Sequence, residues 1–292
     1  MKKVIVIVGP TGSGKTRLSV KLAKLFNAEI INGDSVQIYR RLDIGSAKIK
    51  ESEKDNVAHH LFDIKDPNDS YSVFNFQKDV RSLIDKIDIP MIVGGTGLYI
   101  KAALYQYEFI EKGRDEAFDL SYQSYTNEEL YAMLLKEDPF IQIDLNNRRR
   151  VLRALEQALS GEHRSKKNKK DELLYNPLII YLDLDRSVLD ERLKLRLDQQ
   201  IREGFIEEVE TLDKDNIRVN AIGYRELNQY LDGKITLDEA KAEIISISKK
   251  LAKKQKTFFK NQMHPVILDA LSKTLETDAY ELIKSFLKEE EI

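Results

Sequence analysis

Short apolar runs that end at a glycine or an aspartate recur along the chain. They cover residues 4–8, 28–32, 90–93, 178–182 and 265–268. Runs of this length with almost no polar residue are typical of strands that are buried on both faces of a parallel sheet. The pattern therefore predicts five such strands.

Helical patterns lie between the strands. The clearest cover residues 74–87 and 187–212. The gap between the third and the fourth strand is longer than one crossover requires, and residues 126–135 and 146–159 within it also have helical spacing. We predict a core of residues 1–112 and 171–292 that is interrupted by a helical, basic insertion of residues 113–170.

A glycine-rich segment with a lysine follows the first strand directly and matches the pattern G-x-x-x-x-G-K-[ST]. The backbone N–H groups of such a loop, the lysine and the start of the next helix all attract a phosphate group. This favours an α/β fold with a P-loop NTPase-like parallel sheet and helices on both faces. Polyphosphate contacts are expected from Gly9, Pro10, Thr11, Gly12, Ser13, Gly14, Lys15 and Thr16, with the Thr16 hydroxyl as a candidate Mg²⁺ ligand.

Ligands of parallel sheets gather at the carboxyl ends of the strands, so the loops 9–16, 33–41, 94–97 and 183–186 are expected to share one cleft. Asp34 has two interpretations there, as a general base or metal ligand and as a helix cap. Thr96 offers a hydroxyl in a turn rich in glycine, which is equally typical of a tight connection between strand and helix.

Two arginines, Arg192 and Arg196, lie four residues apart on one predicted helix face. They can bind a leaving phosphate or belong to a surface covered with salt bridges. The four histidines do not have the spacing of a metal site and are interpreted as structural or substrate-lining.

Composition narrows the class of protein. The net charge of −2 argues against a uniformly basic nucleic-acid binder, and the absence of cysteine excludes disulfides and thiolate metal sites. No run approaches the ~20 apolar residues of a membrane span, so a cytoplasmic protein is expected. Residues 146–170 nevertheless hold nine Lys or Arg against two Glu, and residues 249–260 are also basic. These segments have two interpretations: they bind the phosphate backbone of a nucleic acid, or they are charged helix faces exposed to solvent.

Several motifs together resemble one family. They are Asp34-Ser-Val-Gln-Ile-Tyr-Arg40, Gly94-Gly-Thr-Gly-Leu-Tyr99, Arg149-Arg-Val-Leu-Arg-Ala-Leu-Glu156, Gly204-Phe-Ile-Glu-Glu-Val209 and Ala221-Ile-Gly-Tyr-Arg225, in addition to the glycine-rich loop. In order and approximate spacing they resemble the tRNA dimethylallyltransferases (tRNA isopentenyltransferases) of the bacterial type, from residue 4 to about residue 260.

The resemblance implies a reaction. A dimethylallyl group passes from dimethylallyl diphosphate to N6 of the adenosine next to the anticodon on its 3′ side, and diphosphate leaves. It implies Asp34, Arg196 and Thr96 as catalytic residues, with Asp34 accepting the N6 proton and Arg196 stabilising the leaving group. Lys15 and Mg²⁺ at Thr16 would hold the diphosphate.

The resemblance also implies a partner, the anticodon stem-loop of tRNA, bound by an enzyme expected to be a monomer. Phe258 and Phe259 are candidates for base stacking, and ordinary core packing is the alternative. The residues expected to contact tRNA are Asp34, Ser35, Val36, Gln37, Thr96, Arg114, Asn147, Arg148, Arg149, Arg150, Val151, Lys254 and Phe258.

Three alternatives stay open. A free adenine-nucleotide isopentenyltransferase shares the core but does not require the basic insertion. A small-molecule kinase would bind ATP at the same glycine-rich loop. A nucleotide-dependent RNA-binding module would use the loop without catalysis.

Overall fold

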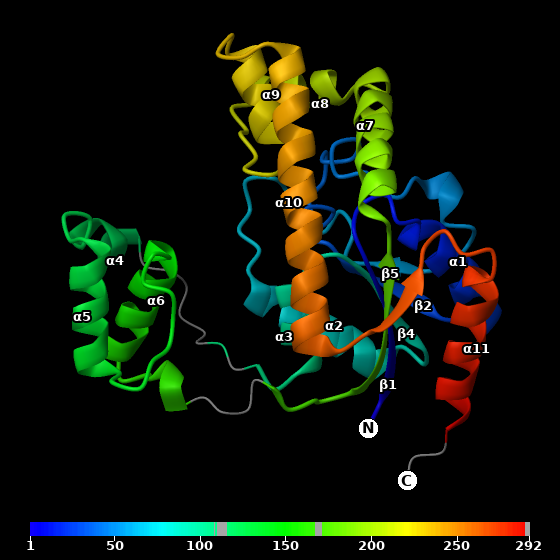
Figure 1. Cartoon of the computed structure of the whole chain (residues 1–292), viewed down its shortest axis with the longest axis horizontal. Coiled ribbons are helices and arrows are strands. Elements are labelled where there is room, and N and C mark those ends of the chain that lie inside the picture. Colours follow the sequence, from blue (N-terminus) through cyan, green and yellow to red (C-terminus); the bar gives the residue numbers. More distant parts are fainter. Residues whose placement is uncertain (108, 110–115, 167–170, 290–292) are drawn as a thin grey trace. The chain divides into compact units, whose positions relative to one another are not determined.

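The computed structural model describes residues 1–107, 109, 116–166 and 171–289 (Figure 1). The chain forms two compact units, one of Met1–Leu104 with Leu174–Ile292 and the other of Tyr105–Leu173. The second unit extends beyond the predicted bounds 113–170 because its two connecting segments pair with each other. The Gln106 N–H donates to the Glu172 carbonyl at 2.8 Å, beside an antiparallel bridge between Tyr105 and Leu173.

The first unit contains a six-stranded sheet in the order β3-β2-β4-β1-β5-β6, in which every neighbouring pair is parallel. All five predicted strands are present. The sixth, β3, was missed because it holds only the two polar residues His59 and His60. The strands are β1 Lys3–Val8, β2 Glu29–Gly33, β3 His59–His60, β4 Pro90–Gly94, β5 Asn176–Asp183 and β6 Val266–Asp269.

Helices cover both faces of the sheet, as predicted (Figure 1). On one face, Ile5 and Ile7 of β1 pack in the same apolar cluster as α1 and α11. On the other face, Tyr181 of β5 contacts the ring of Phe259 in α10. The helices concerned are α1 Lys15–Phe26, α2 Val73–Lys86, α3 Gly97–Leu104, α10 Leu237–Met263 and α11 Leu275–Lys288.

A second apolar cluster lies beyond the sheet, where Leu42, Phe205, Val209 and Tyr224 are buried together. The helical pattern 187–212 is broken into two helices because Gly204, with φ 104°, is left-handed. The helices of this cluster are α7 Arg186–Arg202, α8 Phe205–Lys214, α9 Tyr224–Leu231 and the beginning of α10.

The second unit is a small helical domain with its own core, which includes Leu130, Leu134, Val151 and Leu155. Its helices are α4 Glu116–Ser121, α5 Asn127–Glu137 and α6 Arg148–Leu159, followed by the 3₁₀ turn η2 Arg164–Lys166. Another 3₁₀ turn, η1 Glu51–Glu53, belongs to the first unit. None of the helices in the described ranges of either unit has the length and apolar character needed to cross a membrane.

Candidate active site

The glycine-rich loop joins β1 to α1 and depends on left-handed backbone. Gly12 and Gly14 have φ 84° and 85°, which glycine adopts without the strain that a side chain would bring. Gly14 is also the N-cap residue of α1, which begins at Lys15. The Arg192 guanidinium of α7 donates to the Gly12 carbonyl at 2.7 Å and so fixes the outer turn of the loop.

The loop holds cationic and polar groups that suit an anion. The Lys15 ammonium donates to the Pro10 carbonyl at 2.8 Å. Burial and the nearby Arg196 lower the pKa of Lys15 to about 8, and the Asp34 carboxylate opposes this shift. The Ser13 hydroxyl is buried and, among the described residues, has no hydrogen-bond partner. The Lys15 ammonium and the Ser13 hydroxyl are therefore the candidates in this loop for contact with a phosphate.

Asp34 follows β2 in a turn that a buried asparagine organises. The Asn32 amide group donates to the carbonyls of Asp34 and Leu61, both at 3.0 Å, and its oxygen accepts the Asp34 N–H at 2.9 Å. One carboxylate oxygen of Asp34, Oδ1, accepts the Val36 N–H at 2.8 Å. Within the described part of the chain the other oxygen accepts no hydrogen bond, so it is available to a ligand.

Thr96 connects the Asp34 turn to the end of β4. Its N–H donates to the Gly33 carbonyl at 3.1 Å, and its hydroxyl oxygen accepts the Ser35 N–H at 3.2 Å. The adjacent Gly95 carbonyl accepts a hydrogen bond from the Gln255 amide of α10 at 2.9 Å. The turns after β2 and β4 therefore form one connected polar edge.

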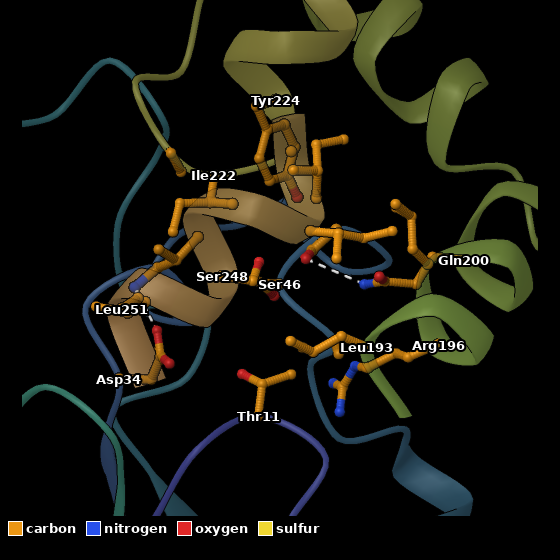
Figure 2. Close-up of a pocket in the computed structure, with 18 of the residues that line it drawn as sticks. Thr11, Asp34, Ser46, Leu193, Arg196, Gln200, Ile222, Tyr224, Ser248 and Leu251 are labelled. Atoms are coloured by element: carbon orange, nitrogen blue, oxygen red, sulfur yellow. Dashed lines mark hydrogen bonds between the residues drawn. The ribbon is translucent and has the colours of Figure 1, made fainter. Parts of the chain in front are cut away.

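A pocket of about 330 Å³ opens beside this edge. Figure 2 shows Thr11, Asp34 and Arg196 around one end of it, and Ile222 and Tyr224 at the other. Burial lowers the pKa of Arg196, while the carboxylates of Asp34 and Glu53 act against this. Much of the remaining wall is apolar and comes from α7, α8 and α10, namely from Leu189, Leu193, Leu197, Phe205, Ile244, Ile245, Leu251 and Ala252.

The pocket thus combines the Asp34 carboxylate and the Arg196 guanidinium at its polar end with an apolar wall, and the buried Lys15 ammonium interacts electrostatically with both charges. Such an arrangement suits a substrate that has an anionic leaving group on an apolar body. The described residues contain no cluster of three or more His, Asp or Glu side chains that suits a metal ion. Thr16 is exposed at the start of α1, and its hydroxyl oxygen is of the hard donor type that Mg²⁺ prefers, so this residue would hold such an ion beside a phosphate.

A model of the IPP transferase family matches residues 37–262. The chain belongs to this family. It is 52% identical over 287 residues to a tRNA dimethylallyltransferase of Acholeplasma laidlawii, covering 98% of this chain and 99% of the relative. The solved tRNA isopentenylpyrophosphate transferase of Bacillus halodurans is 39% identical with a TM-score of 0.76, over 99% of this chain and 97% of that one. A eukaryotic dimethylallyltransferase acting on tRNA is 27% identical with a TM-score of 0.88, over 100% of this chain and 81% of that one.

Two of the four loops predicted to share the cleft do not line the pocket, since neither residues 94–97, which include Thr96, nor residues 183–186 are among its lining residues. The two carboxylates of residues 183–186 have partners outside the pocket. Asp183 pairs with Lys256 at 2.6 Å, and Asp185 caps α7 through the Ser187 N–H at 2.8 Å. Arg196 lies at the pocket, whereas Arg192 supports the glycine-rich loop from outside.

The residues that follow Asp34 divide between the pocket and its support. Ser35 and Val36 line the pocket. The Gln37 amide instead donates to the carbonyls of Ser46 and Ala47, at 3.0 and 3.3 Å. This contact places Gln37 in the loop framework, and its predicted contact with tRNA stays a prediction.

In the helical unit, one predicted tRNA contact is wrong. Val151 is fully buried in the core because it lies on the inner face of α6, so its side chain is inaccessible to RNA. Asn147 caps α6 through the Arg150 N–H. Arg148 donates to backbone carbonyls, among them that of Tyr122 at 2.7 Å. Arg149 and Arg150 are exposed, and Arg114 lies outside the described residues.

The two candidate stacking rings have different environments. Phe259 is fully buried against Tyr181, so for this ring the core alternative holds. Phe258 is half-buried and packs on Gly97 so closely that a β-carbon there would overlap its ring. Lys254 is exposed on α10.

The sequence reasoning missed Asn32, Gln255 and Glu208 as site residues. Asn32 carries a weak sequence signal, since it is a polar residue at the end of an apolar run, and the structure shows that it is completely buried. Glu208 lies within a motif that carries the family resemblance and Gln255 lies in the basic segment 249–260, but only the fold shows which backbone groups they bind.

Proposed function

We propose that this protein transfers a dimethylallyl group from dimethylallyl diphosphate to N6 of the adenosine 3′-adjacent to the anticodon of tRNA. The names of its relatives support a tRNA substrate. The observation that supports the donor and the chemistry is that Asp34 and Arg196 line the polar end of an apolar-walled pocket, while both charges shift the pKa of the nearby Lys15 ammonium.

In this proposal the diphosphate of the donor lies in the glycine-rich loop. Backbone N–H groups, Lys15 and Arg196 stabilise the charge that develops as the bond between C1 and the bridging oxygen breaks. The electron pair of that bond stays on the diphosphate. The dimethylallyl group lies along the apolar wall near Leu193 and Leu251.

The acceptor amine attacks from the side of Asp34. As the bond between N6 and C1 forms, the free oxygen of the Asp34 carboxylate accepts a proton from N6. Asn32 and Thr96 keep the carboxylate at the strand end while this happens. Mg²⁺, held by Thr16 and the diphosphate, would supply further neutralisation of the leaving group.

The helical unit and α10 would bind the tRNA. Arg149, Arg150 and Lys254 are exposed basic residues suited to phosphate contacts, and Phe258 has a partly exposed ring. Because the acceptor base is stacked in a folded loop, it must turn out to reach Asp34. We propose that the enzyme acts as a cytoplasmic monomer.

A competition assay tests the proposal. The protein is incubated with Mg²⁺, dimethylallyl diphosphate labelled in the prenyl carbons, and an equimolar mixture of unmodified tRNA and AMP. Label is expected in tRNA alone, and nuclease digestion followed by mass spectrometry is expected to find it on the adenosine next to the anticodon.

Two results would contradict the proposal. Label in AMP and none in tRNA would favour a free-nucleotide isopentenyltransferase. Phosphate transfer from γ-labelled ATP to a small acceptor, with no prenyl transfer, would favour a kinase. A tRNA in which that adenosine is replaced by guanosine is the matched control, and it is expected to stay unlabelled.

A further inference from the structure

Glu208 of α8 holds a loop by three consecutive backbone N–H groups. Its carboxylate accepts the N–H groups of Asp43, Ile44 and Gly45 at 3.0, 2.7 and 3.0 Å. It also accepts the hydroxyl of Tyr224 at 2.6 Å. Adjacent N–H groups that point to the same side of a loop cannot satisfy one another, so they require one external acceptor.

The loop that Glu208 holds is a wall of the pocket. Gly45, Ser46 and Ala47 all line it, whereas Glu208 itself does not. The carbonyl groups of the same loop are bound as well, because the Gln200 amide of α7 donates to the Ile44 and Gly45 carbonyls. Figure 2 shows the bond that Gln200 makes to the loop from the side of α7. The wall therefore has a fixed position between α7 and α8.

The same loop is joined to the turn that carries the proposed base. The Gln37 amide donates to the Ser46 and Ala47 carbonyls, and Gln37 lies three residues after Asp34. A chain of hydrogen bonds thus runs from the Glu208 carboxylate, through residues 43–47, to the Asp34 segment. Since hydrogen bonds to an ionised acceptor are stronger than those between neutral groups, Glu208 is the firmest anchor of this chain.

Gly45 shows how closely the wall is fitted to its support. A β-carbon at this position would overlap the Phe205 ring and lie 2.7 Å from the Tyr224 ring. The loop backbone therefore lies directly on the two rings, and a small shift of the loop changes the shape of the pocket.

We propose that Glu208 is a positioning residue for the transfer reaction. It touches no substrate, and it sets the pocket wall of residues 43–47 and, through Gln37, the place of Asp34. This inference rests on the proposed prenyl transfer for its kinetic consequence but not for its structural one.

The test compares Glu208→Gln with Glu207→Gln in the full chain. Glutamine keeps the size of the side chain, but its NH₂ group faces backbone donors, so about half of the hydrogen bonds are lost. Glu207 is exposed on the same helix and has no bond to the loop, which makes it the matched control. Hydrogen exchange is measured by mass spectrometry, and kcat, the donor KM and the tRNA Kd are measured separately.

For Glu208→Gln, we expect faster exchange confined to residues 43–48 and a fall in kcat of about 10- to 100-fold, the scale of a small misplacement of catalytic groups. The tRNA Kd is expected to match that of Glu207→Gln. Unchanged exchange in residues 43–48 would overturn the anchoring, and kcat equal to that of Glu207→Gln would overturn the positioning role.

A second variant, Glu208→Asp, keeps the proposal testable if Glu208→Gln does not fold. Glu208→Asp keeps the charge but reaches less far, and it is expected to give an intermediate kcat at a Tm close to that of the wild type. A kcat equal to that of the wild type, with the loop loosened, would overturn the proposal. The exchange comparison requires no substrate, so its result is independent of whether the chain transfers a prenyl group.

Discussion

The substitution Asp34→Asn separates the two roles that the structure gives to this carboxylate. Oδ1 holds the turn by accepting the Val36 N–H at 2.8 Å, and the other oxygen is free among the described residues. Asparagine retains an oxygen for the Val36 N–H and removes the proton acceptor. Asp34→Ala removes both, so the difference between the two variants measures what the hydrogen bond from the Val36 N–H contributes.

The magnitude follows from these roles. A positioned general base contributes about 10²- to 10⁴-fold to the rate, so kcat of Asp34→Asn is expected to fall by that factor. Asp34→Ala is expected to be slower still and less stable by about 1 kcal/mol, the net value of a typical hydrogen bond. The Kd for tRNA is expected to change little in either variant, because the phosphate contacts proposed to dominate affinity lie elsewhere.

The assay is a single-turnover measurement with labelled donor and excess enzyme, together with filter binding for tRNA. Asp185→Asn is the matched control, because Asp185 makes the same bond to the N–H two residues ahead, at 2.8 Å, and does not line the pocket. If Asp34→Asn transfers the prenyl group within threefold of the Asp185→Asn rate, the carboxylate is not the base.

Three further predictions concern the loop, the wall and the helical unit. Burial and Arg196 lower the pKa of Lys15 to about 8, so the ammonium loses its proton above pH 8. Affinity for the donor, measured by calorimetry, is therefore expected to fall above pH 8 by up to about tenfold per pH unit. The Lys15→Gln variant is expected to lack this pH dependence. Gly45→Ala is expected to lower the free energy of unfolding by about 1–3 kcal/mol in urea titrations, because the added methyl group overlaps the Phe205 ring. The double variant Arg149→Gln and Arg150→Gln is expected to bind tRNA more weakly. The slope of log affinity against log salt concentration is expected to become smaller by about 1–2, and kcat is expected to stay unchanged.

Each of these expectations has a result that contradicts it. Donor affinity that is flat from pH 7 to 9 would remove the Lys15 charge from binding. A Gly45→Ala protein with the same free energy of unfolding as the wild type would mean that the loop can move away from the Phe205 ring without loss of stability. An unchanged salt dependence in the double variant would exclude both arginines from phosphate contact.

The strands were predictable because their signal is local. The longer strands have apolar centres because both faces of the sheet are covered, and their polar residues, such as Asn32 of β2, lie near the strand ends. The short β3 lacks this signal, and its two histidines join the sheet only because β2 offers an edge. The break between α7 and α8 at Gly204 was equally hidden, since apolar residues continue at helical spacing on both sides of the glycine.

The polar end of the site was predictable for the same reason. The glycine-rich loop and Asp34 each follow a strand directly, and a parallel sheet brings such ends together. Val151 was assigned incorrectly because the basic run and the amphipathic pattern of α6 overlap in sequence. Charge density identified the segment, and only the helical period separates the buried Val151 from the exposed Arg149 and Arg150.

The wall of the pocket could not be predicted, because its shape depends on contacts between residues far apart in sequence. Glu208 reaches Ile44 across 164 positions, and Gln255 reaches Gly95 across 160. A motif records that such residues occur, but not which backbone groups they bind. The charged residues that define the chemistry therefore follow the strands directly and can be found from local sequence. Their orientation depends on contacts with α7, α8 and α10, which local sequence does not show. Substitutions at the edge should thus lower the rate of transfer the most, and substitutions in the supporting helices should lower it less, while tRNA still binds in both cases.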